Sequence, residues 1–127
     1  MHNLNIACLC SEDYYNLDAL NLAIKSGILP INLKLVIINS KCKCIEYCKK
    51  NKINNEYLPW DSKKQQREKY DKIISDKINS HNIDIILLSN WSHSFGLLFK
   101  KEHKTILKVN PVYSSVLKSS NTTEIFN

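Results

Sequence analysis

Short apolar runs alternate along the chain with segments in which apolar residues recur at helical spacing. The first run, Leu4 to Cys10, is apolar almost throughout and ends at the polar cluster Ser11-Glu12-Asp13. Continuous apolar runs of this kind are typical of buried strands in parallel sheets. The same reasoning predicts five strands, over residues 4–10, 33–39, 56–59, 83–90 and 105–109.

The segments between these runs carry the pattern of amphipathic helices. In the first segment Asn16 is placed to cap the helix and Gly27 to end it. The longest helical pattern starts at Asp61 or Ser62 and ends near His81, with its inner face predicted to carry Tyr70, Ile73, Ile74 and Ile78. Two further short helices are predicted over residues 41–51 and 94–103.

This alternation of strand and helix predicts the α/β class. We expect a single Rossmann-like domain, in which a mostly parallel five-stranded sheet has helices on both faces. At 127 residues the chain is long enough for one such domain and too short for two. We assign residues 1–118 to the domain and 119–127 to a loose tail. The most continuous apolar run, residues 83–90, is predicted to be the central strand.

The formal net charge of +6 raises the question of nucleic-acid binding. Of the 18 basic residues, 17 are Lys and only Arg67 is Arg. Phosphate and base recognition favours the bidentate guanidinium group, whereas Lys is a point charge on a flexible stem. Lys, Asn and Ile together fill 48 of the 127 positions, and all three have A/T-rich codons, so base composition explains the charge. We therefore expect no nucleic-acid partner.

Five cysteines are an odd number in a chain whose first residues lack the pattern of an export signal. A disulfide framework is therefore not expected, and the cysteines should be reduced thiols. A zinc site that joins Cys10 to Cys42 is an alternative, but no C-x-x-C pair is present. We prefer the interpretation that they pack as small hydrophobic residues, and we expect no metal.

The longest purely apolar run in the second half of the chain, Ile85 to Leu88, is far shorter than a membrane span. Together with the absence of an export pattern at the start, this predicts a cytoplasmic protein that does not bind membranes.

Ligands of parallel α/β sheets bind beyond the carboxyl ends of the strands, where the strand order reverses. This rule selects three loops, over residues 11–15, 89–94 and 108–115. The first loop has no glycine and carries Glu12, which would repel a phosphate, although Asn16 could still donate to one. The alternative is a helix-entry loop whose acidic residues favour the helix dipole.

The second loop holds Trp91 and His93 directly after the predicted central strand. His93 could carry a proton near neutral pH, because the ordinary pKa of histidine lies there. The alternative is an inert histidine on a surface loop.

Three stretches of the sequence resemble the folate-dependent formyltransferase family, in particular the N-terminal half of phosphoribosylglycinamide formyltransferases. The segment "DSKKQQREKYDKIISDKINSHNIDIILLSNW" is similar to the family's serine cap, its R-E-x-Y-D helix and its D-V-V-V-L-A-G-F strand. The segment "NIACLCSEDYYNLDAL" resembles the opening strand, the phosphate loop and the S-N-L-x-A-L helix. The segment "KVNPVYSSVL" falls where the family carries N-x-H-P-S-L-L-P. The resemblance covers about residues 4–117.

The resemblance implies formyl transfer from 10-formyltetrahydrofolate to a substrate amine through a tetrahedral oxyanion. The family uses the Asn and His of N-x-H-P for this, together with an Asp from further along its chain. Lys108 occupies the Asn place and Asn110 the His place, while Pro111 is retained. Lys108 could stabilise an oxyanion by its charge and Asn110 could donate to it. The implied catalytic residues are thus Lys108, Asn110 and His93.

The other implied contacts follow from the same matches. Ser11 and Asn16 fall in the loop that holds the substrate phosphate, and Trp91 and His93 fall at the folate loop. The implied acceptor is glycinamide ribonucleotide, a small molecule of purine biosynthesis. Because the glycines of the phosphate loop and two catalytic identities are changed, we carry two hypotheses. The first is a divergent formyltransferase, completed by a second chain that supplies the C-terminal half, and the second is a catalytically silent binding or assembly module.

Overall fold

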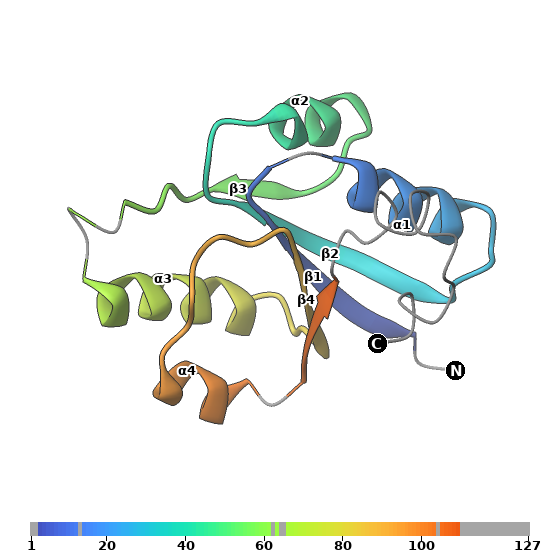
Figure 1. Cartoon of the computed structure of the whole chain (residues 1–127). Coiled ribbons are helices and arrows are strands. Elements are labelled where there is room, and N and C mark those ends of the chain that lie inside the picture. Colours follow the sequence, from blue (N-terminus) through green and yellow to red (C-terminus); the bar gives the residue numbers. More distant parts are fainter. Residues whose placement is uncertain (1–2, 13, 62, 64–65, 104, 110–127) are drawn as a thin grey trace, which may run out of the picture.

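The computed structural model describes residues 3–12, 14–61, 63, 66–103 and 105–109. Strands and helices alternate along the chain, as the sequence pattern predicts (Figure 1). Their order is β1 (Leu4–Cys10), α1 (Tyr15–Lys25), β2 (Ile31–Ile38), α2 (Lys43–Lys50), β3 (Asn55–Tyr57), α3 (Arg67–Asn79), β4 (Ile85–Ser89), α4 (Leu97–Glu102) and β5 (Ile106–Val109). The proposed tail, residues 119–127, lies outside the described residues.

The five strands form one sheet in the order β3-β2-β1-β4-β5, and every pairing is parallel. The α/β class and the Rossmann-like sheet are therefore confirmed. The prediction that residues 83–90 form the central strand was wrong, because β1 lies in the middle and β4 lies between β1 and β5. A continuous apolar run indicates that both faces of a strand are covered. β1 and β4 both have such a run, so the run alone does not show which of the two strands is central.

Helices cover both faces of the sheet (Figure 1). On β1, Ala7 and Leu9 point to the face covered by α3 and α4, where they pack with Tyr70 and other core residues. Cys8 and Cys10 point to the opposite face, where they pack with α1 and α2. This alternation follows from the two-residue repeat of a strand. It explains why β1 is apolar almost throughout.

Some element boundaries differ from the predictions. α1 begins at Tyr15, so Asn16 lies inside its first turn and does not cap it. Gly27 ends the α1 segment in the left-handed region, with φ of 81°, as predicted. α3 begins at Arg67 after an extended Gln66, which is later than the predicted start at Asp61 or Ser62. Ile73 is exposed, so it does not belong to the inner face of α3.

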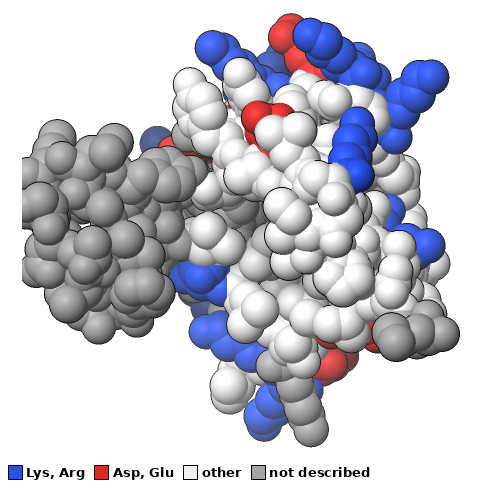
Figure 2. All heavy atoms as spheres, turned by 90° about the vertical axis from the view of Figure 1, so that its right-hand side faces the viewer, with Lys and Arg blue, Asp and Glu red and all other residues white. Residues whose placement is uncertain are grey.

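Charged side chains are spread over the surface and do not line one groove in the face shown in Figure 2. Lys and Arg side chains gather at the top of that view, over α2, and again near its bottom, with a mostly uncharged area between them. Within the described part of the chain, no helix combines the length and apolar character that crossing a membrane requires.

Candidate functional site

The carboxyl ends of β1, β2 and β4 meet at one edge of the sheet. From β1 the chain runs to β2 on one side and returns through α3 to β4 on the other, so the strand order reverses between β1 and β4. Such a reversal is where ligands of open α/β sheets bind. Ser11 follows β1, Asn39 follows β2 and Asn90 follows β4 at this edge.

A network of hydrogen bonds connects these strand ends. The backbone N–H of Ser92 donates to Oγ of Ser11 over 2.7 Å, and Nδ2 of Asn39 donates to Oγ of Ser92 over 3.2 Å. The hydroxyl of Ser40 donates to the carbonyl oxygen of Ser11. Ser11 and Asn39 are both buried. Ser11, one of the residues expected to bind substrate, is thus tied to the loop that holds Trp91 and His93.

Stacked aromatic residues lie where the loop after β1 enters α1. The ring centroid of Tyr14 lies 5.1 Å from that of Tyr15 and 5.2 Å from that of Tyr47 on α2, and both pairs are stacked. Tyr47 donates to Oδ1 of Asp18 over 2.7 Å, and burial together with this bond raises the pKa of Tyr47 to about 12. No glycine brings the backbone close to a phosphate here, and Asn16 is half-buried in the first turn of α1.

His93 lies inside the protein and not on a surface loop. Its side chain is 1% exposed, and its Nε2 lies 2.5 Å from Oδ1 of Asp71 on α3. The other oxygen of Asp71 accepts the backbone N–H of Gly96 over 2.8 Å. A Cβ at Gly96 would meet that oxygen at 3.3 Å, so the glycine permits the close approach. Asp71 therefore fixes both His93 and the start of α4.

Aromatic rings surround His93 on several sides. The ring centroids of Trp60, Tyr70 and Phe95 lie 4.4, 4.8 and 5.0 Å from that of His93, each in an edge-on arrangement. Trp91 lies further away at 6.4 Å and stacks on Phe95. The histidine is thus held in an aromatic shell directly below the carboxyl edge.

Three buried polar atoms near this edge have no hydrogen-bond partner among the described residues. They are Oδ1 of Asn39, Nε1 of Trp91 and Nδ1 of His93. Buried polar atoms in proteins are nearly always bonded, to protein, to ordered water or to a ligand. All three belong to the end of β2 or to the loop after β4, which makes this edge the best candidate for a binding site.

The remaining predicted site residues lie further along the edge. Lys108 is exposed on β5 and pairs in register with Leu88 of β4. β4 therefore separates Lys108 from β1 and Ser11. Asn110, the other catalytic candidate, lies outside the described residues. The structure brings Ser11 together with the Trp91–His93 loop, and it places Lys108 on the neighbouring side of that loop.

The sequence interpretation missed Asp71, Asn39 and Ser92. Asp71 carried a signal, because it is a carboxylate next to Tyr70 on the inner side of an amphipathic helix and is buried. A buried carboxylate needs a hydrogen-bonding or charged partner, so the position of Asp71 on this face predicts that one lies nearby. Asn39 and Ser92 carried only the weaker signal of polar residues at or after strand ends.

The cysteines gather on the α1 and α2 face of the sheet and form no disulfide. The Sγ atoms of Cys8 and Cys10 lie 3.6 Å apart. Burial raises the pKa of Cys42, and raises that of Cys48 to about 12, so both are protonated thiols at neutral pH. Among the residues that the structure describes, no three His, Cys, Asp or Glu side chains are arranged to hold a metal ion.

No family model matches the sequence, and no curated protein matches it. Solved structures with the same fold do exist. Glycinamide ribonucleotide transformylase 1 from Geobacillus kaustophilus superposes with a TM-score of 0.79 at 20% identity, over 87% of this chain and 59% of that chain. The phosphoribosylglycinamide formyltransferase from Coxiella burnetii gives 0.78 at 20% identity, over 95% and 62%. A formyltetrahydrofolate deformylase from Pseudomonas putida gives 0.77 at 13% identity, over 86% and 38%.

The chain has the formyltransferase fold. It spans about 59% of the length of the first of these structures, so the fold is shared over only part of that protein. One local detail of the formyltransferase fold can be compared directly. Asn90 stands where the D-V-V-V-L-A-G-F strand pattern has Gly, and its φ of 53° is in the left-handed region that glycine adopts without strain. In the turn after β4, Asn90 thus adopts a backbone conformation that glycine would adopt more easily.

Proposed function

We propose that this chain is the N-terminal part of a divergent phosphoribosylglycinamide formyltransferase-like protein of the cytoplasm. Its reaction is formyl transfer from 10-formyltetrahydrofolate to glycinamide ribonucleotide, a step of purine biosynthesis. The formyltransferase fold supports this proposal, because ligands of such sheets bind at the edge where Ser11 and the loop of Trp91 and His93 lie. The C-terminal half, with a catalytic Asp, comes from further chain or from a second chain.

The observation that carries the proposal is the set of three unpartnered polar atoms on Asn39, Trp91 and His93. They combine hydrogen-bonding groups with the faces of Trp91 and neighbouring rings. The pterin ring of a folate is flat and carries donors and acceptors around its rim. Such a ring needs this combination of aromatic surface and a few convergent polar groups.

Formyl transfer also needs a group that stabilises the oxyanion of the tetrahedral intermediate. Lys108 supplies a positive charge at the exposed end of β5, beside the loop after β4. An exposed lysine on a flexible stem is less well positioned than a buried amide donor. We therefore expect turnover by this chain alone to be very slow or undetectable.

The second candidate function is a catalytically silent binding or assembly module. The loop after β1 favours it, because stacked tyrosines and Glu12 fill the place of a glycine-rich phosphate loop. In addition, Oγ of Ser11 already accepts the N–H of Ser92 and is buried. Residues 11–15 contain no Lys or Arg, so a phosphate would find no positive charge in this loop.

A pair of assays on the purified chain separates the two functions. Binding of 10-formyltetrahydrofolate is followed by calorimetry, and formyl transfer to glycinamide ribonucleotide by product detection. Trp91→Ala should weaken folate binding, whereas Trp60→Ala, which removes another ring that contacts His93, should weaken it less. Lys108→Ala should lower any turnover by about 10²-fold or more, and Lys34→Ala, an exposed strand lysine away from the edge, should not change it.

The outcomes are distinct. Folate binding with turnover that depends on Lys108 supports the divergent enzyme. Folate binding without turnover, both by the chain alone and after a formyltransferase C-terminal half is added, supports the silent module. No folate binding by a folded chain contradicts both versions of the site, and turnover that Lys108→Ala leaves unchanged shows that the catalytic group lies elsewhere.

A further inference from the structure

Asp71 determines which ring nitrogen of His93 carries the proton. Oδ1 of Asp71 lies 2.5 Å from Nε2 of His93, and Oδ2 accepts the backbone N–H of Gly96 over 2.8 Å. A carboxylate has no proton to donate, and an imidazole is a stronger base than a carboxylate, so the proton of this contact belongs to Nε2. In the neutral ring, Nδ1 is then an acceptor.

The surroundings of Nδ1 favour the neutral ring. Nδ1 of His93 is buried and makes no hydrogen bond among the described residues. A second proton, on Nδ1, would create a buried N–H donor with no acceptor, which costs free energy. His93 therefore keeps one acceptor atom that needs a donor from outside the fold.

The more exposed part of the shell around His93 consists of two tryptophans. The ring centroids of Trp60 and Trp91 lie 4.4 and 6.4 Å from that of His93, and both side chains are half-buried. The other rings of the shell, on Tyr70 and Phe95, belong to the buried core. A ligand thus approaches His93 past the tryptophans and not through the core.

We propose that Asp71 is a positioning residue of the folate site. It holds His93 with the proton on Nε2, so that Nδ1 accepts a hydrogen bond from an N–H group of the pterin ring. This inference rests on the proposed function, because it takes the folate as the ligand. It adds a requirement on the ligand, which must place a donor at His93. An anionic group, which only accepts, would find no bond there.

The variant Asp71→Asn should reverse the polarity of His93 with little change of shape. The Asn side chain has one acceptor oxygen, and the backbone N–H of Gly96 needs it, so the amide NH₂ group faces His93. Nε2 must then accept a hydrogen bond, and the ring proton moves to Nδ1. His93 would present a donor where the wild type presents an acceptor.

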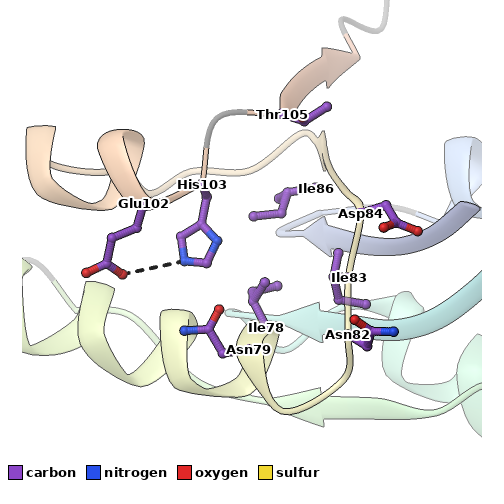
Figure 3. A pocket seen from close by; sticks show the side chains of 9 residues that line it. All are labelled: Ile78, Asn79, Asn82, Ile83, Asp84, Ile86, Glu102, His103 and Thr105. Atoms are coloured by element: carbon purple, nitrogen blue, oxygen red, sulfur yellow. Dashed lines mark ion pairs between the residues drawn. The ribbon is translucent and has the colours of Figure 1, made fainter.

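NMR of the whole chain with ¹⁵N-labelled histidine measures this directly, because two-bond ¹H–¹⁵N correlations show which ring nitrogens are protonated. His93→Gln assigns the signals of His93. His103 is an internal reference, since its Nε2 lies 2.7 Å from Oγ of Ser75, beside a separate hollow that Glu102 also lines (Figure 3). Asp71→Asn should invert the pattern of His93 and leave that of His103 unchanged.

Calorimetry with 10-formyltetrahydrofolate connects the tautomer to the ligand. Asp71→Asn should bind it about tenfold more weakly, which corresponds to the loss of one hydrogen bond. The matched control is Asp76→Asn, which removes the same charge from an exposed carboxylate of the same helix that pairs with Lys72. It should change neither the tautomer nor the affinity.

Thermal unfolding of each variant checks that it is folded, and the wild-type spectrum tests the tautomer even if Asp71→Asn does not fold. Three results would overturn the proposal. These are a proton on Nδ1 of His93 in the wild type at neutral pH, a tautomer that Asp71→Asn leaves unchanged, and an inverted tautomer with unchanged folate affinity. A folded wild-type chain that binds no folate is a different result. It contradicts the proposed function, and the spectra still decide whether Asp71 sets the tautomer of His93.

Discussion

Nε2 of His93 lies 2.5 Å from Oδ1 of Asp71, and the two side chains are 1% and 10% exposed. The pair joins α3 to the loop after β4, and the second oxygen of Asp71 holds the backbone N–H of Gly96. A single carboxylate thus anchors the segment between β4 and α4 at two residues, His93 and Gly96. The shape of the candidate folate loop depends on this contact.

Replacement of Asp71 should therefore be costly. Asp71→Ala leaves a buried histidine and a backbone N–H without their partner, and we expect a loss of about 3 to 5 kcal/mol of unfolding free energy. Asp71→Asn keeps an acceptor and should lose less. Asp76→Ala, which removes a mostly exposed carboxylate of the same helix that pairs with Lys72, should change stability by less than about 1 kcal/mol. Urea denaturation measures all three, and equal effects of Asp71→Ala and Asp76→Ala would contradict the anchoring role.

The second prediction concerns the backbone of Asn90, in the turn after β4. A β-branched residue at φ of 53° is strained, so Asn90→Val should cost about 1 to 2 kcal/mol. Asn90→Gly should be neutral or slightly stabilising, because glycine adopts this region freely. The matched control is Asn51→Val, at a residue with φ of −97°. If both valine variants lose the same stability, backbone strain is not the cause.

The stability of the fold should depend on His103 between neutral and mildly acidic pH. Burial lowers the pKa of His103 in the folded protein, so the unfolded chain binds a proton more readily. The stabilising contribution is therefore complete above the unfolded pKa of about 6.5, and it decreases as the pH falls through that value toward the lower folded pKa. Denaturation of wild type and His103→Gln across this range should show a shallower acid decline in the variant. A parallel decline in both would exclude His103 as its source.

Nucleic-acid binding should be weak and sensitive to salt. The lysines are spread over α2 and the lower surface and form no groove in Figure 2, and Lys does not provide bidentate recognition. Fluorescence anisotropy with a DNA duplex should show binding at low ionic strength that disappears near physiological salt. Sequence-selective binding that persists at physiological salt would contradict the base-composition interpretation of the charge.

The sheet could be predicted because its strands are short, apolar and separated by helical patterns. β1 was predicted with its observed limits, since the polar residues after Cys10 end the apolar run. The position of β4 in the sheet could not be predicted in the same way. Both β1 and β4 are apolar over most of their length, and only the pairing of distant segments decides which of them is in the middle.

The sequence predicted at which edge of the sheet the candidate site lies, but it predicted the residues of that site less well. Ser11 and the loop at Trp91 lie at the expected edge, because parallel strands place their carboxyl ends together. The environment of His93 could not be read from its neighbours in the sequence. Its burial depends on α3, where Asp71 and Ser75 lie one helical turn apart on the inner side. Asp71 contacts His93, and Ser75 contacts His103. These contacts form only when α3 packs against residues 90–103, so they cannot be predicted from neighbouring residues in the sequence.

The central place of β1 has a consequence for how the chain folds as it is made. One side of β1 pairs with β2, whose residues 31–38 follow soon after it, but the other side pairs with residues 85–89 of β4. Until β4 is synthesised, the backbone N–H and C=O groups on that side of β1 have no strand partner. An open edge on an apolar strand can pair with other chains. The strand that ends up most enclosed in the folded protein is therefore the one most exposed to aggregation during synthesis.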